Sequence, residues 1–146
     1  CHWLMWQPVN QGRQLVQQLL RLKAASEMQA GQGQAAADKA RQQLAAGQPL
    51  EVAGYTLPAA LVHSLEQATL EPPAQVGRLE WLEVSTRADA TLLPASVATL
   101  QAWRAAGAQV REQVVQGPAF WQSTEIEAAP ALLAASLAAL CDGATA

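Results

Sequence analysis

The sequence has few of the residues that bind metals or carry out nucleophilic chemistry. Its 146 residues include two cysteines, Cys1 and Cys141, at opposite ends of the chain, and two histidines, His2 and His63. Cysteines so far apart in the sequence build neither a disulfide framework nor a paired-thiolate metal site, so we predict a reducing, cytoplasmic setting. Neither histidine has a cysteine or a carboxylate at metal-ligand spacing, and a lone histidine is most often a partly exposed polar side chain. The sequence therefore predicts no metal site.

Charged residues are also scarce. They make up 14% of the chain against 51% apolar residues, which is typical of a packed globular protein and not of a disordered segment. The 9 lysines and arginines are outnumbered by 12 aspartates and glutamates, and the net charge is −3. Because the chain has no basic excess to neutralise a phosphate backbone, we expect no nucleic acid partner.

Motifs for catalysis and cofactor binding are missing as well. The sequence contains no G-x-S-x-G elbow, no glycine-rich phosphate loop and no dinucleotide fingerprint, so we expect no cofactor. Its longest apolar stretch, residues 128–141, is too short to cross a bilayer and predicts a buried helix. The first nine residues lack the pattern of a signal peptide. The chain opens at Cys1, inside a predicted strand and without an initiating methionine, which suggests a fragment of a longer protein.

Strands and helices alternate on either side of a glutamine-rich insertion. Apolar runs and helical periodicity predict strands at residues 2–5, 79–84 and 109–115, and helices at 94–106 and 128–140. Pro94 opens the first of these helices and Gly107 closes it. Short connections from strand to helix to strand imply parallel strands joined by a right-handed crossover. The predicted fold class is α/β, with a three-stranded parallel sheet and flanking helices.

The insertion, residues 11–73, is predicted to form a helical cap on a core made of residues 1–10 and 74–146. Its expected elements are a helix over 14–28, a mobile linker over 30–34, a short helix capped by Asp38 and stopped by Gly47, extended pieces over 50–57 turning at Gly54, and a helix opened by Pro58. These elements are joined irregularly, unlike the alternation in the core.

Ligand groups in parallel sheets gather beyond the carboxyl ends of the strands. The first such loop carries Asp89, just past a strand end and before a helix. A carboxylate in that place suits the orientation of a catalytic imidazole. The same residue also suits a structural role, through local backbone bonds or a pair with Arg87.

The second loop, residues 116–127, contains no histidine to serve as a general base. Phe120 and Trp121 are adjacent large rings that would form the wall of a pocket or fill it. Glu125, together with Ser123 or Thr124, would cap the last helix, or its carboxylate would face the cleft.

Several segments carry a resemblance to a known family: HWLMWQPV, GRQLVQQLLRLKAASEM, LAAGQPLEVAGYTL, AWRAAGAQV and VVQGPAFWQSTEIEAAPALLAASLAAL. They resemble the C-terminal half of the α/β-hydrolase-like proteins called exosortase A system-associated hydrolase 2, and the resemblance spans nearly the whole chain. It implies a partial α/β-hydrolase fold, in which the predicted strands are the sixth, seventh and eighth of the sheet. It also implies that Asp89 is the triad acid and that Phe120 and Trp121 occupy the place of the triad histidine.

The resemblance implies a role beside the exosortase and exopolysaccharide system, with a degenerate triad and accessory or weak hydrolase activity. Two alternatives remain: an active ester or thioester hydrolase in the full-length protein, and a non-catalytic domain that binds an acyl or lipid-like ligand or a protein. A further expectation is self-association through the exposed edge of the strand that contains Trp3 and Met5.

Overall fold

The computed structural model describes residues 2–28, 33–122 and 125–141. The chain divides into two compact units, Cys1–Asn10 with Glu71–Ala146, and Gln11–Leu70. The smaller unit ends at Leu70, three residues before the predicted end of the insertion at residue 73. The role of this unit as a cap stays a prediction.

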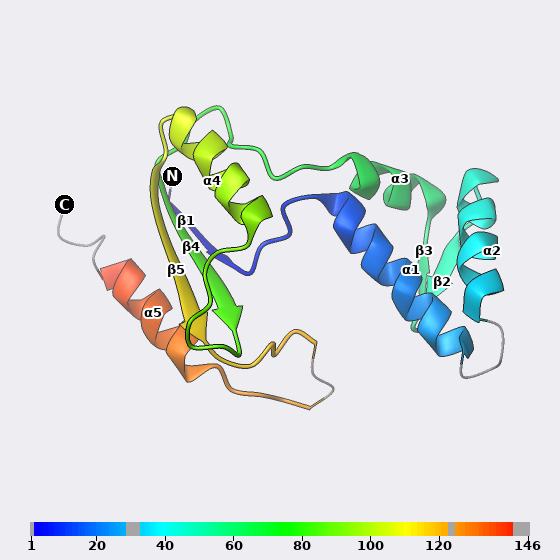
Figure 1. Ribbon diagram of the computed structural model, residues 1–146. Coiled ribbons are helices and arrows are strands. Elements are labelled where there is room, and N and C mark those ends of the chain that lie inside the picture. The colour runs from blue at the N-terminus through cyan, green and yellow to red at the C-terminus, as the bar shows by residue number, and fades with distance from the viewer. Residues whose placement is uncertain (1, 29–32, 123–124, 142–146) are drawn as a thin grey trace. The chain divides into compact units, whose positions relative to one another are not determined.

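A three-stranded parallel sheet is the centre of the larger unit. Its strands are β1 (His2–Trp6), β4 (Arg78–Ser85) and β5 (Gln109–Gln116), in the order β1-β4-β5 (Figure 1). In register, Trp3 lies beside Leu79, and Leu79 beside Val110. The prediction of an α/β unit with three parallel strands is confirmed.

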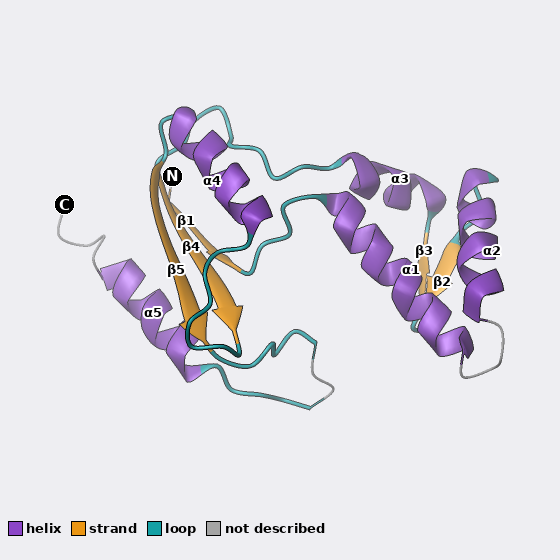
Figure 2. Cartoon of the chain, viewed as in Figure 1, coloured by secondary structure: helices purple, strands orange, loops and turns teal. Residues whose placement is uncertain are grey.

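Two helices, α4 (Pro94–Ala105) and α5 (Pro130–Cys141), flank this sheet (Figure 2). Alternate residues of a strand point to opposite faces, so odd and even positions of β1 pack against different helices. Trp3 meets the buried Trp103 of α4 in an edge-to-face contact at 6.3 Å. On the other face, Leu132 of α5 packs in one cluster with Leu82 of β4, and Leu4 of β1 packs against that cluster. The two helices therefore cover opposite faces.

The ends of α4 follow the prediction closely. Pro94 occupies the first turn of the helix, where the missing N–H has no intrahelical partner to lose. The helix ends at Ala105, and Gly107 adopts a φ of +94°, the left-handed conformation that commonly terminates helices.

The expectation that residues 128–141 form a buried helix is wrong. In α5 only Leu132 and Ser136 are buried, whereas Leu133, Leu137 and Leu140 keep 53%, 64% and 62% of their surface exposed. A helix that is apolar on every side gives no periodic signal of which face meets the sheet. In the parts of the chain that the structure describes, no helix is both long enough and apolar enough to span a membrane.

The smaller unit contains three helices and a short hairpin. Its elements are α1 (Gly12–Met28), α2 (Gly33–Ala45), β2 (Leu50–Val52), β3 (Tyr55–Leu57) and α3 (Ala59–Gln67). Its core consists of buried apolar side chains from four of these elements: Val16, Leu20, Ala40, Leu44, Leu50, Val52, Ala59 and Val62. The strands β2 and β3 pair antiparallel around Ala53 and Gly54, both with positive φ, as a two-residue hairpin turn requires. The predicted turn at Gly54 and the helix after Pro58 are confirmed.

The predicted start of the second helix is wrong. The helix α2 begins at Gly33, so Asp38 lies inside it and pairs with Arg41 at 3.8 Å instead of capping its first turn. A run of alanines favours helix strongly enough to extend it past an available cap residue. Of the linker expected over 30–34, residues 30–32 lie outside the described residues, and Gly33 and Gln34 belong to the helix. The helix ends as predicted, with Gly47 at a φ of +73°.

The two ends of the smaller unit are joined to each other. The N–H of Gly12 donates to the carbonyl of Ala68 at 2.8 Å, and Gln11 forms an isolated antiparallel bridge with Thr69. A Cβ atom at Gly12 would lie 1.8 Å from the carbonyl oxygen of Leu65. Only glycine fits this close approach between the start of α1 and the end of α3.

Candidate functional site at the carboxyl edge of the sheet

The carboxyl ends of β1, β4 and β5 meet at one edge of the sheet because the strands are parallel. Gln7, at a φ of +39°, follows β1 and bridges to β4 twice. Its N–H donates to the carbonyl of Leu82 at 2.8 Å, and its Oε1 accepts from the N–H of Val84 at 2.9 Å. Gly117 donates to the carbonyl of Ser85 at 2.9 Å from the β5 side. These bonds fix the backbone from which the site's side chains project.

Three aromatic side chains from two segments form a connected group at this edge, which we call the aromatic edge cluster: Trp6, Phe120 and Trp121. Trp6 and Phe120 meet at 6.4 Å with an interplanar angle of 90°, and Phe120 and Trp121 meet at 5.2 Å and 84°. Edge-to-face geometry is favoured because the positive rim of one ring meets the negative face of the other. Trp6 and Trp121 keep 44% and 42% of their surface exposed. Phe120 packs against the apolar core between the sheet and α5.

A buried serine anchors the cluster. Ser136 of α5 accepts a hydrogen bond from Nε1 of Trp6 at 2.9 Å, and its hydroxyl donates to the carbonyl of Leu132 at 2.7 Å. Both hydrogen-bonding functions of the hydroxyl are therefore used. Neither Trp6 nor Ser136 could be selected from the sequence, because their contact joins residues 130 positions apart. The high aromatic content of HWLMW was the local feature that could have pointed to Trp6 as a site residue.

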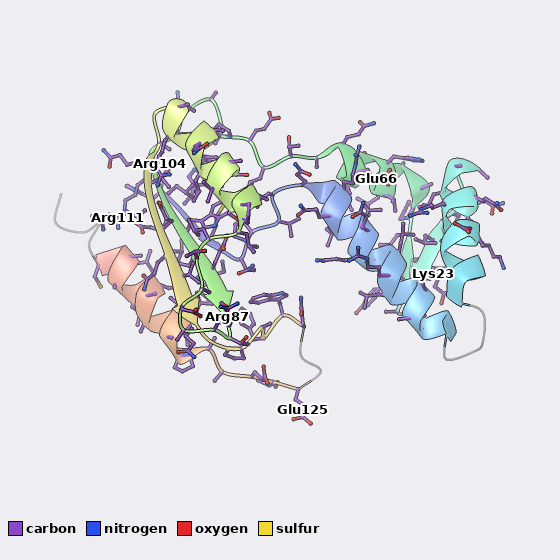
Figure 3. All side chains as sticks on the ribbon, viewed as in Figure 1. Lys23, Glu66, Arg87, Arg104, Arg111 and Glu125 are labelled. Carbon is purple, nitrogen blue, oxygen red and sulfur yellow. The ribbon has the colours of Figure 1, made fainter. Side chains whose placement is uncertain are left out.

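Asp89 forms a local ion pair. Nε and Nη2 of Arg87 donate to its two carboxylate oxygens at 3.3 and 3.1 Å. The side chain of Asp89 is 77% exposed and that of Arg87 is 75% exposed. Figure 3 shows Arg87 beside the ends of the strands. The two histidines of the chain lie elsewhere: His2 is at the start of β1 and His63 is in α3 of the other unit. The structure thus shows Asp89 bound to Arg87.

Glu125 does not cap the last helix. The helix α5 begins at Pro130, which puts its cap position at Ala129, and Glu125 lies on the preceding loop (Figure 3). Its predicted neighbours Ser123 and Thr124 lie outside the described residues. The capping interpretation of Glu125 is therefore wrong.

A buried carboxylate that the sequence did not predict lies near the same edge. Glu83 is buried in β4, where its Oε1 accepts from Nε1 of Trp81 at 3.1 Å and its Oε2 accepts from the N–H of Leu93 at 3.0 Å. Leu93 is the residue before α4 and lacks a side-chain cap of its own. Glu83 therefore holds the start of α4 against the sheet. The position of Glu83 between apolar residues in the strand segment WLEVS was the sequence feature that could have predicted its burial.

A second buried polar contact supports the same helix. Nδ2 of Asn10 donates to Oγ of Ser96 at 3.1 Å, and both residues are buried. Within the described residues, Oδ1 of Asn10 has no hydrogen-bond partner. Together with Glu83, this contact positions the first turn of α4.

No group of three His, Cys, Asp or Glu side chains that could hold a metal exists among the described residues. A groove of about 450 Å³ lies on the α5 face, lined by residues of β4, β5 and α5 that include Glu80, Arg111 and Ala138. It contains none of the predicted site residues.

Comparisons with known proteins found no matching family model, no matching curated protein and no matching solved structure.

Proposed function

We propose that this chain is the C-terminal part of an α/β-hydrolase-like protein of the exosortase and exopolysaccharide system, with an accessory, cytoplasmic role. In this role it binds an acyl or lipid-like ligand at the aromatic edge cluster and contributes no general base. The resemblance of its segments to that family and the parallel sheet with its two flanking helices support this assignment.

The observation that carries the proposal is the exposure of two fixed indole rings at the carboxyl edge. Trp6 is held by Ser136 and Trp121 by its contact with Phe120, so both rings present a preorganised apolar surface. Preorganised aromatic surface binds an apolar chain without a large cost in side-chain entropy. Ligands of parallel sheets bind at this edge.

Among the residues that the structure describes, the groups needed for hydrolysis are not assembled beside these rings. Asp89 is engaged by Arg87, and neither histidine lies on the loops of this edge. General-base activation of a nucleophile contributes several powers of ten in rate. Binding is therefore the activity that these residues support best.

Isothermal titration of the chain with decanoate, below its micellar concentration, tests the proposal. We expect saturable binding that is weakened about tenfold or more in Trp121→Ala, because the ring's apolar contact is lost. Val97→Ala is the matched control, since Val97 is an exposed apolar residue of α4. The proposal fails if the chain takes up no decanoate, or if Trp121→Ala binds as well as the unaltered chain.

A further inference from the structure

The pairing of β1 with β4 changes its character at Gln7. The last regular pair is Trp6 with Leu82, so the next pair in the ladder would be Gln7 with Glu83. In a parallel ladder that pair forms two hydrogen bonds, from the N–H of Gln7 to the carbonyl of Leu82 and from the N–H of Val84 to the carbonyl of Gln7. The first of these bonds is present at 2.8 Å.

The side chain of Gln7 makes the second bond in place of its backbone. A φ of +39° takes Gln7 out of the strand conformation, and its Oε1 accepts from the N–H of Val84 at 2.9 Å. A residue other than glycine adopts a positive φ at an energetic cost, and such strain is concentrated at functional sites. The strained backbone here accompanies a side-chain amide that is held in place.

The bond to Val84 also fixes which way the amide of Gln7 is turned. Because the N–H of Val84 is a donor, the amide oxygen faces it and the NH₂ group faces away. Gln7 is partly buried, and its Nε2 is neither enclosed nor bonded to an acceptor within the described part of the chain. The carboxyl edge of the sheet thus carries an oriented hydrogen-bond donor.

This donor adjoins the aromatic edge cluster. Gln7 directly follows Trp6, and Val84 packs against the same apolar core as Phe120. Gly117 also approaches Val84, since a Cβ atom at Gly117 would lie 3.4 Å from Cγ1 of Val84. The amide is bound on the β4 side of β1, between two paired strands, so its place does not depend on the other edge of β1. A polar donor and exposed indole rings therefore share one end of the sheet.

We propose that Gln7 determines the head-group specificity of the site, by donating a hydrogen bond from Nε2 to the carbonyl oxygen of an acyl ligand. This role rests on the proposed binding of an acyl chain at the aromatic edge cluster. The head of the ligand lies at Gln7, and its alkyl chain extends over Trp6 and Trp121. An uncharged N–H donor recognises an acceptor oxygen, such as that of an ester or amide carbonyl, and does not require an anion.

Gln7→Glu separates the structural role of this side chain from the binding role. A glutamate keeps an oxygen to accept from the N–H of Val84 but has no N–H to donate to a ligand. Two uncharged probes with chains of similar length, 2-decanone and 1-decanol, distinguish these states. The ketone only accepts hydrogen bonds, whereas the hydroxyl of the alcohol can also donate to a carboxylate.

Titration of the chain with each probe at neutral pH, followed by tryptophan fluorescence, measures the two affinities. We expect Gln7→Glu to bind 2-decanone about tenfold or more weakly than the unaltered chain, and 1-decanol within about threefold of it. Trp121→Ala should weaken both probes to a similar degree, because the chain and not the head contacts that ring. Gln116→Glu is the matched control at the end of β5, since Nε2 of Gln116 already donates to the carbonyl of Thr86 at 3.3 Å. It should leave the ratio of the two affinities unchanged.

Amide hydrogen exchange at Val84 tests the orientation of the amide separately. The N–H of Val84 should stay protected in Gln7→Glu and exchange faster in Gln7→Leu, which has no acceptor. Equal protection in Gln7→Leu would overturn the inferred orientation.

The binding results distinguish the role of Gln7 from the function on which it rests. If the unaltered chain binds neither probe, the proposed function and the role of Gln7 fail together. If both probes bind and both are weakened by Trp121→Ala, but Gln7→Glu loses no affinity for 2-decanone relative to 1-decanol, the proposed function stands and the role of Gln7 is overturned.

Discussion

The indole of Trp6 and the hydroxyl of Ser136 meet at 2.9 Å and tie the end of β1 to the middle of α5. The contact joins two elements that flank the core formed by Leu82, Val115 and Leu132. It also sets the orientation of the ring on which Phe120 packs edge-to-face. One hydrogen bond therefore links the packing of α5 to the exposed aromatic surface at the carboxyl edge.

Ser136→Ala should lower the free energy of unfolding of the larger unit by about 1 kcal/mol, because a half-buried indole N–H loses its acceptor. All five tryptophans lie in this unit, so tryptophan fluorescence during urea unfolding follows it alone. Trp6→Phe should have a similar effect, and the double variant should cost less than the two single changes together. Fully additive losses would show that the two side chains do not interact.

Glu83→Gln should lower the stability of the larger unit by about 1–3 kcal/mol. The carboxylate accepts two hydrogen bonds, and an amide offers an oxygen to only one of the two donors, Trp81 Nε1 or Leu93 N–H. The other donor would then face an NH₂ group in a buried place. The measurement is the urea midpoint by tryptophan fluorescence, with the exposed Glu127→Gln as control. Equal midpoints for the two variants would contradict the buried role of Glu83.

The elements that the sequence predicted well are those bounded by proline, which has a fixed φ, or by glycine, which readily adopts a positive φ. Pro94 and Gly107 mark the two ends of α4, and Gly54 marks the hairpin turn. Local chemistry determines such boundaries, so a single sequence is sufficient to place them. The parallel arrangement of β4 and β5 followed from their short connection through α4.

The burial of α5 and the anchor of the aromatic edge cluster could not be predicted in the same way. Every side of α5 is apolar, so its composition contains no information about which leucines face the sheet. The contact of Trp6 with Ser136 depends on the tertiary fold, because neither residue has a local partner that marks it. Asp89 was singled out by its place after a strand, and the adjacent Arg87 already provided a local partner.

Gly12→Ala should destabilise the smaller unit by about 1–3 kcal/mol or more, because the new methyl group would overlap the carbonyl of Leu65 and force the backbone apart. Thermal unfolding by far-UV circular dichroism would show the loss, while tryptophan fluorescence of the larger unit stays unchanged. Gly117→Ala is the matched control, since its methyl would meet Val84 at an ordinary 3.4 Å. A stability loss in Gly117→Ala as large as that in Gly12→Ala would contradict this explanation.

Asp89→Asn distinguishes the binding role from that of an active hydrolase. Because the pair with Arg87 is exposed and solvent-screened, the substitution should change the free energy of unfolding by less than about 0.5 kcal/mol. Decanoate binding at the aromatic edge cluster should also be unchanged, since the carboxylate belongs to a separate ion pair. For the full-length protein of the proposed function, we expect no turnover of an aryl ester above the uncatalysed rate, before or after the substitution. Turnover that is present in the parent and lost in Asp89→Asn would instead identify Asp89 as the acid of a working triad, with its imidazole supplied from outside this chain.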